Sequence, residues 1–358
     1  MKILAFALYI IFSTAQNACS PYKCVTTNMN VNKDTCFYFN HTDEAYWIQP
    51  CPNATVYCPV SYNENSPIQC EAAVKPTKQA WPGEKCTNND NCLPGSTCNG
   101  NICVGKTVGE ACTDNSDCNP QLYCGANKQC QQQILAGKTG CTNDFMCVNS
   151  ALCNYTSGQD PSKARCLNAY SLLPGTIIAD CPVSGINPLC IAELCIQNNG
   201  ISYCGDKVVS VNSIPITCNS YVDCMSLTDR FVGGYYYSNC SCGYNADASA
   251  YCELFPGDQP YSRYLTLKQI WLSSQEVNLC NTERRDIGPC MQNYFADYVE
   301  LAYQYLYVSI YPKIQANTDC VKEVMNTNFW GLWQKIVDQD ETSSSLLRII
   351  SLIALYFI

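Results

Sequence analysis

Apolar residues recur at helical spacing in one part of the chain, residues 256–338. The segment between Pro289 and Pro312 has one apolar face and one polar face, which predicts an amphipathic helix bounded by the two prolines. A second helix is expected near the end of this region, and a third, weaker one covers Leu265 to Leu279. The apolar positions are Met291, Tyr294, Phe295, Tyr298, Val299, Ala302, Tyr305 and Leu306 in the first helix and Val321, Val324, Met325, Phe329, Leu332, Trp333 and Ile336 in the second. We interpret the tyrosine and tryptophan stripe as a core, with binding of sugar or lipid as the alternative.

The first residues of the chain have the pattern of a secretory signal peptide. Met1-Lys2 is a short basic start, Ile3 to Phe12 is apolar, and Ser13-Thr14-Ala15 offers small residues for cleavage. We therefore expect residues 1–15 to be a signal peptide, rather than a buried N-terminal helix. Secretion would deliver the chain to an oxidising compartment, where paired cysteines persist.

A second apolar run, Leu346 to Ile358, follows a small polar stretch. Its thirteen residues contain Arg348 and are too few to span a hydrocarbon core of about 30 Å. Small residues before an apolar tail are typical of a GPI-attachment signal. We expect residues 339–358 to be such a signal, with Ser343 and Ser344 as attachment candidates; the alternative is a last helix of the folded domain.

Between these regions apolar residues are sparse, and cysteines occur at regular intervals. Over residues 81–170 three units follow one another, opened by "GEKC", "GEAC" and "KTGC", and most successive cysteines have five residues between them. A period of about 26 to 29 residues predicts three tandem modules. The cysteines concerned are Cys86, Cys92, Cys98, Cys103, Cys112, Cys118, Cys124, Cys130, Cys141, Cys147, Cys153 and Cys166.

Zinc binding, redox catalysis and structural disulfides are three possible uses of these sulfur atoms. Structural zinc sites use closely spaced cysteine pairs, often with histidine, and thioredoxin-type chemistry uses C-x-x-C. No C-x-x-C occurs among the thirty cysteines, whose even number permits full pairing. We therefore predict disulfides, paired within each unit, although four cysteines allow three pairings and the sequence does not choose among them.

The residues between the cysteines explain why such units need crosslinks. The unit at residues 112–130 holds two large apolar side chains, Leu122 and Tyr123. Their burial cannot offset roughly 1–2 kcal/mol of backbone entropy per ordered residue. A disulfide that closes a ~15-residue loop contributes about 3 kcal/mol in the chain-entropy model. The first loop of each unit is rich in Asn and Asp, which we interpret as turn-forming residues rather than calcium ligands.

The stretch "GEKCTNNDNCLPGSTCNGNICVGKTVGEACTDNSDCNPQLYCGANKQC" resembles the Dickkopf N-terminal cysteine-rich type of module. It is also similar to cysteine-repeat surface proteins of protists. The resemblance covers about residues 81–170 and rests on the C-x5-C spacing and the "GE-x-C" opening. It implies small disulfide-rich modules with short β-hairpins and an extracellular setting. Since Dickkopf proteins are secreted Wnt antagonists, it also implies a signalling antagonist as an alternative function.

Two further cysteine-rich regions flank the three units. Residues 16–80 hold six cysteines, which allows an independent module with three bridges, and the aromatic stretch between Cys36 and Cys51 favours a strand pair. Residues 171–255 have the appearance of degenerate copies of the repeat. The fold class predicted is therefore small disulfide-rich modules followed by an α-helical segment.

The composition of the chain limits which kinds of partner we expect. Charged residues make up 14% of the chain, the net charge is −9, and no run of Lys or Arg occurs, so we expect no nucleic-acid partner. Four N-x-[S/T] sequons predict glycosylation at Asn40, Asn53, Asn154 and Asn239. Asn239 is the least favoured of these sites, because the neighbouring Cys240 is expected to be bridged.

Catalytic patterns are absent from the sequence. The single histidine, His41, lies in a sequon, and no G-x-S-x-G or HExxH motif occurs. Asp297 and Glu300 are better interpreted as solvated than as the carboxylate pair of a hydrolase. We expect a non-catalytic, glycosylated coat or ligand-binding protein without cofactor on the outer face of the plasma membrane, with an extracellular protein or glycan as its partner. A secreted Dickkopf-like antagonist and a secreted hydrolase are the alternatives.

Overall fold

The computed structural model describes residues 19–25, 34–52, 55–59, 67–72, 79–155, 160, 162–182, 185–206, 215–228, 235–286, 288–315, 319–325, 327 and 329–336. The expected signal peptide, the expected GPI signal with Ser343 and Ser344, and the sequon residue Asn53 lie outside these residues. Within them, short β-hairpins held by disulfides are followed by a helical segment, which is the predicted fold class.

Five cysteine repeats follow one another between residues 79 and 252. We number them repeat 1 (residues 79–104), repeat 2 (105–132), repeat 3 (133–168), repeat 4 (169–206) and repeat 5 (215–252). Repeats 1 to 3 each contain a 3₁₀ turn and a hairpin: η1 (Asn89–Asn91), β7 (Thr97–Asn99) and β8 (Ile102–Val104); η2 (Asn115–Asp117), β9 (Leu122–Cys124) and β10 (Cys130–Gln132); η3 (Asp144–Met146), β11 (Ala151–Asn154) and β12 (Arg165–Asn168). Repeat 4 contains β13 (Ile177–Ile178), β14 (Cys195–Asn198) and β15 (Ile201–Cys204), and repeat 5 contains β16 (Thr217–Cys218), η4 (Tyr221–Cys224), β17 (Met225–Thr228), β18 (Tyr235–Tyr237), β19 (Cys240–Cys242) and β20 (Ala250–Cys252).

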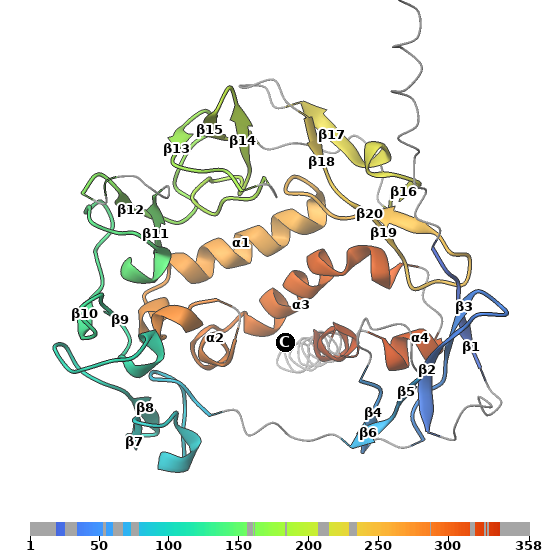
Figure 1. The fold of residues 1–358 in the computed structure, drawn as a ribbon, viewed down its shortest axis with the longest axis horizontal. Helices are drawn as coiled ribbons and strands as arrows, with labels where there is room; N and C mark the ends of the chain where they lie inside the picture. The colour runs from blue at the N-terminus through green and yellow to red at the C-terminus, as the bar shows by residue number, and fades with distance from the viewer. Residues whose placement is uncertain are drawn as a thin grey trace, which may run out of the picture.

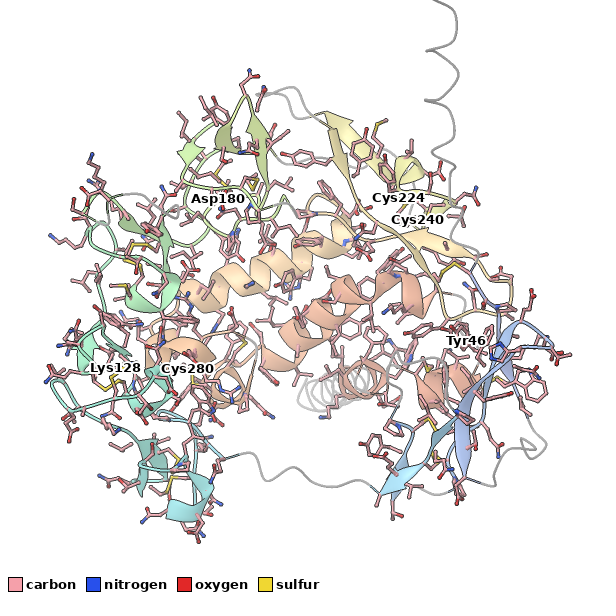
Figure 2. The ribbon with its side chains drawn as sticks, in the orientation of Figure 1. Tyr46, Lys128, Asp180, Cys224, Cys240 and Cys280 are labelled. Atoms are coloured by element: carbon pink, nitrogen blue, oxygen red, sulfur yellow. A yellow bond between two sulfur atoms is a disulfide. The ribbon has the colours of Figure 1, made fainter. Side chains whose placement is uncertain are left out.

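Repeats 1 to 4 have the same disulfide connectivity, first cysteine to third and second to fourth. Repeat 5 has a fifth cysteine, Cys242, which bonds Cys19, and its other four cysteines follow the same order. Figure 2 shows the bridges as yellow bonds spread over the modules. They are Cys86–Cys98 and Cys92–Cys103, Cys112–Cys124 and Cys118–Cys130, Cys141–Cys153 and Cys147–Cys166, Cys181–Cys195 and Cys190–Cys204, and Cys218–Cys240 and Cys224–Cys252. The three tandem units thus pair internally, as predicted, and the degenerate region 171–255 adds two further copies with the same connectivity.

A glycine before the first cysteine is common to repeats 1 to 4. Gly83, Gly109, Gly137 and Gly175 have φ of 94°, 86°, 82° and 81°, a left-handed conformation that favours glycine. Each of these N–H groups donates to the carbonyl oxygen of the last cysteine of its own repeat, at 2.8, 2.9, 2.7 and 2.8 Å. This shared bond explains why repeat 4 keeps the architecture although its cysteine spacing differs.

The N-terminal region forms a four-stranded sheet in the order β1-β3-β2-β5 and a small pair, β4 with β6. The strands are β1 (Tyr22–Cys24), β2 (Thr35–Asn40), β3 (Ala45–Ile48), β4 (Val56–Tyr57), β5 (Ile68–Gln69) and β6 (Glu71–Ala72). Strands β2 and β3 confirm the strand pair expected between Cys36 and Cys51. Here too the connectivity is first to third and second to fourth, Cys36–Cys58 and Cys51–Cys70.

The structure corrects one expectation for this region. Its other two cysteines do not bridge each other: Cys19 pairs with Cys242 and Cys24 with Cys320. Residues 16–80 are therefore not a self-contained three-bridge module. The physical reason is that the apolar face of its sheet packs on the C-terminal part of the chain, which brings these cysteines together. The cluster contains Tyr22, Phe37, Tyr46, Ile48, Tyr244, Val321, Val324 and Met325.

The helical segment, residues 259–336, is called the hub below. It consists of α1 (Gln259–Ser273), η5 (Glu276–Leu279), η6 (Thr282–Arg284), α2 (Pro289–Tyr294), α3 (Tyr298–Ser309), η7 (Tyr311–Ile314) and α4 (Asp319–Val324), and residues 329–336 are also helical. Its one internal bridge is Cys280–Cys290, and both sulfur-bearing residues are buried. Its core includes Trp271, Leu267, Val277, Met291 and Leu301.

The helix expected between Pro289 and Pro312 is interrupted. Helix α2 ends at Tyr294 and α3 begins at Tyr298, because Phe295 takes an extended conformation that places its ring 5.5 Å from the ring of Trp271. The weak third helix is also shifted: α1 begins at Gln259 and ends at Ser273, and a 3₁₀ turn follows. The apolar spacing located these helices, but core packing set their ends.

The repeats surround the hub. In Figure 1 they pass from β7 and β8 through β9 to β12, over β13 to β15, and on to β16 to β20, while α1 and α3 lie in the middle. The N-terminal strands lie beside α4. Among the described residues, no helix is both long enough and apolar enough to cross a bilayer.

Candidate binding groove

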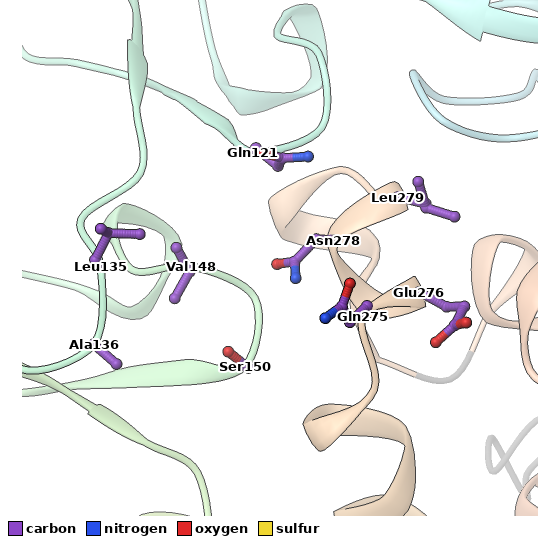
Figure 3. Close-up of a pocket in the computed structure, with 9 residues that line it drawn as sticks. All are labelled: Gln121, Leu135, Ala136, Val148, Ser150, Gln275, Glu276, Asn278 and Leu279. Carbon is purple, nitrogen blue, oxygen red and sulfur yellow. The ribbon is translucent and has the colours of Figure 1, made fainter.

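A groove of about 710 Å³ lies where repeats 2 and 3 meet the hub (Figure 3). One wall comes from the repeats and the other from η5. The lining residues are Gln121, Leu135, Ala136, Val148, Ser150, Gln275, Glu276, Asn278 and Leu279.

The groove combines exposed aliphatic side chains with uncharged hydrogen-bonding groups. Leu135 is 61% exposed and Leu279 is 44% exposed, so both give the lining accessible apolar surface. Amide and hydroxyl groups lie between them, and Glu276 is the one carboxylate of the lining. No aromatic ring is among the nine lining residues, so no flat platform for a sugar ring is present in the groove.

The wall formed by repeat 3 is fixed by a buried amide. Asn149 is 1% exposed, and its Nδ2 donates to the carbonyl oxygens of Val277 and Cys280, both at 2.8 Å. Its Oδ1 accepts from Nε2 of Gln133 at 3.1 Å. Because these two hub carbonyls end the 3₁₀ turn η5, the same amide holds the turn and the repeat together.

A reciprocal contact fixes repeat 2. Asn281 of the hub is fully buried, and its Nδ2 donates to the carbonyl oxygens of Asn115 at 2.8 Å and Cys118 at 2.9 Å. Its Oδ1 accepts from the N–H of Glu283 at 3.0 Å. The hub therefore caps η2 of repeat 2, as repeat 3 caps η5 of the hub. Both walls of the groove are positioned before any ligand binds.

Arg285 adds a charged contact to repeat 3. This side chain is 6% exposed, and its Nη1 donates to the carbonyl oxygens of Ala151 at 3.0 Å and Asp144 at 3.3 Å. Burial lowers the pKa of its guanidinium group. Since the contact is with backbone, it serves the interface between repeat and hub rather than the groove.

Repeat 4 is attached to the hub by a buried polar cluster. Glu193 is 3% exposed and accepts from the hydroxyl groups of Tyr170 at 2.9 Å and Tyr261 at 2.8 Å, with Lys268 Nζ at 3.9 Å. Burial, followed by the neighbouring charge of Glu193, raises the pKa of both tyrosines. Two protonated hydroxyl groups and an ammonium group offset the cost of burying the carboxylate. All four side chains therefore have a structural role.

Repeat 1 is attached through Glu84, Arg284 and Trp81. Oε2 of Glu84 accepts from the N–H of Trp81 at 3.0 Å, and the Arg284 guanidinium lies 4.4 Å from the Trp81 ring centroid. Arg284 Nε is 3.9 Å from Glu84 Oε1. Burial raises the pKa of Glu84, against the opposing effects of the backbone bond and of Arg284.

The "GE-x-C" motif and the Asn/Asp-rich loops can now be explained. In repeat 2, Glu110 accepts from the backbone N–H and hydroxyl of Thr107, as Glu84 does from Trp81. Asn115 Oδ1 accepts from the N–H of Cys124 at 2.8 Å, and Asp117 accepts from Thr113. Equivalent bonds run from Cys98 to Asn89 and from Cys153 to Asp144, both at 2.8 Å. The acidic and amide residues therefore shape turns, as predicted.

All thirty cysteines are described, and all are in disulfides. Several groups of three lie close enough to surround a metal ion, for example Cys86, Cys92 and Cys103, but their sulfur atoms are bonded to other sulfur atoms. The twelve cysteines singled out in the sequence are thus structural.

The remaining sites expected from the sequence lie apart from the groove. Asn40 is at the end of β2 and accepts from the N–H groups of Thr42 and Asp43. Asn154 ends β11 and accepts from the N–H of Ala179 at 2.7 Å. Asn239 is exposed, and its Nδ2 donates to Glu253 at 3.0 Å.

None of the three grooves described here is lined by a pair of carboxylates. Besides the groove between repeats 2 and 3, a smaller one of about 280 Å³ beside α1 contains Asp206, and one of about 580 Å³ in repeat 1 contains no carboxylate. Glu300 makes two hydrogen bonds with Arg263, both at 2.6 Å.

Sequence reasoning did not identify the groove. Its residues come from three separate stretches, and none belongs to a known motif. One feature of the sequence hinted at the groove. Leu135 is an aliphatic residue in a polar linker between two modules, where the neighbouring residues cannot bury it. Asn149 and Asn281 gave no signal, because a buried asparagine is indistinguishable in sequence from the many turn asparagines.

Comparison with protein-family models, with curated proteins and with solved structures finds no match to this chain. The fold itself defines the class: a disulfide-rich protein in which small cysteine modules surround a helical hub. Fifteen disulfides fit an extracellular protein.

Proposed function

We propose that this is a non-catalytic, glycosylated protein of the outer cell surface that binds an extended segment of an extracellular protein in the groove between repeats 2 and 3. The observation that carries the proposal is the pairing of Leu135 and Leu279 with amide and hydroxyl groups in one pre-formed groove. An aliphatic side chain of a peptide would bury the leucines, and its backbone would bond the amides. The missing aromatic platform makes a peptide a better ligand than a glycan. No cofactor and no nucleic acid are part of the proposal.

Selection from a random peptide library against the full chain tests the binding. We expect enriched peptides to carry an aliphatic residue and to bind Leu135→Arg at least about tenfold more weakly, because burial of a leucine contributes about 1.5–3 kcal/mol. Leu173→Arg is the matched control. Leu173 is 64% exposed and lies two residues before Gly175 of repeat 4, as Leu135 lies two residues before Gly137 of repeat 3. Selected peptides that bind the wild type, Leu135→Arg and Leu173→Arg equally would refute the groove as the binding site. A glycan that competes with these peptides would show that the ligand is a glycan and not a peptide.

Attachment to the membrane is a separate part of the proposal. We propose that the C-terminal segment, residues 339–358, directs GPI attachment at Ser343 or Ser344. Phase partition of the native protein before and after phospholipase C measures this, and mass spectrometry of the C-terminal peptide identifies the site. A protein that stays in the aqueous phase without treatment would instead favour the diffusible antagonist.

A further inference from the structure

A group of aromatic side chains lies on the last helices, outside the groove. We call it the aromatic patch: Tyr303 and Tyr307 of α3 with Phe329, Trp330 and Trp333 of the helix at residues 329–336. Its rings contact one another in series. Ring centroids are 5.1 Å apart for Tyr303 and Phe329, 6.1 Å for Tyr307 and Phe329, 4.8 Å for Phe329 and Trp330, and 6.3 Å for Trp330 and Trp333.

The patch has a buried interior and an exposed rim. Phe329 is 2% exposed, Tyr303 and Tyr307 are half-buried, and Trp333 is 43% exposed. Burial raises the pKa of both tyrosines. The interpretation of this stripe as core therefore holds for Phe329 but not for Trp333, whose indole ring lies beside the half-buried ring of Trp330.

A lysine borders the patch. The Nζ atom of Lys322 lies 5.3 Å from the Trp330 ring centroid. Tryptophan, tyrosine and lysine together are the side chains enriched where a membrane meets water, since the rings lie among headgroups and the ammonium groups bond phosphates. A sugar site would also use tryptophan, but it needs no flanking ammonium groups.

The sequence places this patch close to the proposed attachment site. Six residues, 337–342, separate Ile336 from Ser343. Even fully extended, such a stretch spans at most about 25 Å. GPI attachment at Ser343, as proposed above, replaces the apolar run by a lipid-linked glycan, so the end of the helix at residues 329–336 is held within about that distance of the glycan that carries the lipid.

We propose that the aromatic patch rests on the phospholipid surface, with Trp333 among the headgroups and Lys322 beside their phosphates. This inference rests on the proposed membrane attachment. In this arrangement, the side of the hub that carries residues 329–336 faces the membrane. The cysteine repeats are then the part of the protein presented to partners.

Quenching of tryptophan fluorescence by brominated phosphatidylcholine tests the contact. The full chain is reconstituted into phosphatidylcholine vesicles with or without phosphatidylserine, and flotation is measured on the same samples. The chain has five tryptophans, of which Trp271 is fully buried. We expect Trp333→Phe to lose at least half of the quenching. Trp81→Phe, in repeat 1, is the control and should keep it. Circular dichroism of each variant verifies that the hub is folded.

The outcomes separate the two proposals. A chain that floats with the vesicles but is quenched equally in the wild type and Trp333→Phe is attached through its tail alone, which overturns the patch contact and leaves the attachment standing. A chain that neither floats nor is quenched refutes both. An emission change that depends on protein concentration and not on lipid assigns the patch to a second copy of the chain and also overturns the contact. Lys322→Glu should further reduce quenching in vesicles that contain phosphatidylserine.

Discussion

Replacing Asn281 by alanine is expected to loosen repeat 2 from the hub. The substitution removes the two N–H groups that bond the carbonyl oxygens of Asn115 and Cys118, at 2.8 and 2.9 Å. Asn115 O keeps one bond, from the N–H of Cys118 at 3.1 Å, so it loses only a second donor. Cys118 O loses the donor that Asn281 supplies inside the interface.

The size of the effect follows from these two losses. An unsatisfied buried carbonyl costs about 1–3 kcal/mol, and a hydrogen bond lost without leaving an unpaired group costs about 0.5–1.5 kcal/mol. We therefore expect the free energy of opening this interface to fall by about 2–4 kcal/mol, which is a rise of about 30- to 700-fold in the open population.

Reduction of a buried bridge measures that population. Cys118 and Cys130 are both fully buried, so dithiothreitol attacks their bridge only after the repeat opens. Differential alkylation and mass spectrometry give the rate for each bridge. Cys190–Cys204 of repeat 4, also fully buried, serves as the reference bridge in the same molecule. We expect Asn281→Ala to accelerate reduction in repeat 2 and not in repeat 4.

A matched variant completes the test. Asn278 is half-buried, lies three residues away and faces the groove (Figure 3). Asn278→Ala should leave both rates within about threefold of the wild type, as surface substitutions change stability by less than about 0.5 kcal/mol. Equal rates in the wild type and Asn281→Ala, or a rise shared by both repeats, would show that the amide does not hold this interface.

Three further predictions concern pH, glycosylation and connectivity. Because burial raises the pKa of Glu84, its contribution to stability is present at low pH and is lost as the pH rises through the raised pKa. The melting temperature of the wild type, relative to that of Glu84→Gln, should therefore fall between about pH 4 and pH 7. A rise of this difference would mean that the attraction between Glu84 and its cationic partner Arg284 dominates. Mass spectrometry after enzymatic deglycosylation in ¹⁸O-labelled water should find Asn40 occupied and Asn239 unoccupied, since the amide nitrogen of Asn239 donates to a carboxylate and its neighbouring cysteine is bridged; high occupancy of Asn239 would contradict that bond. Peptide mapping without reduction should find Cys24 linked to Cys320, whereas a bridge from Cys24 to another cysteine of residues 16–80 would restore the self-contained module.

Some of the architecture was readable from local sequence. The spacing of cysteines and the repeated openings predicted modules with internal bridges, since a unit with so little apolar surface must be crosslinked to be ordered. Apolar spacing likewise located the helices, and the turn-forming role of Asn and Asp followed from side chains that reach only their own loop. Each of these features depends on residues fewer than about thirty positions apart, so it can be predicted from the local sequence.

What only the tertiary structure decided depends on surfaces that meet from distant parts of the chain. Four cysteines allow three pairings, and the hairpin geometry of each module selects first to third and second to fourth. Cys24 joins Cys320 because the N-terminal sheet packs on α4, and Cys19 joins Cys242 because the same sheet packs on Tyr244, just after β19. The break at Phe295 follows from the position of Trp271. The groove exists because two buried amides about 130 residues apart in sequence fix the repeats to the hub: Asn149 of repeat 3 bonds carbonyl groups of the hub, and Asn281 of the hub bonds carbonyl groups of repeat 2. No local pattern encodes such a contact, since its energy arises only after burial has removed water from both partners.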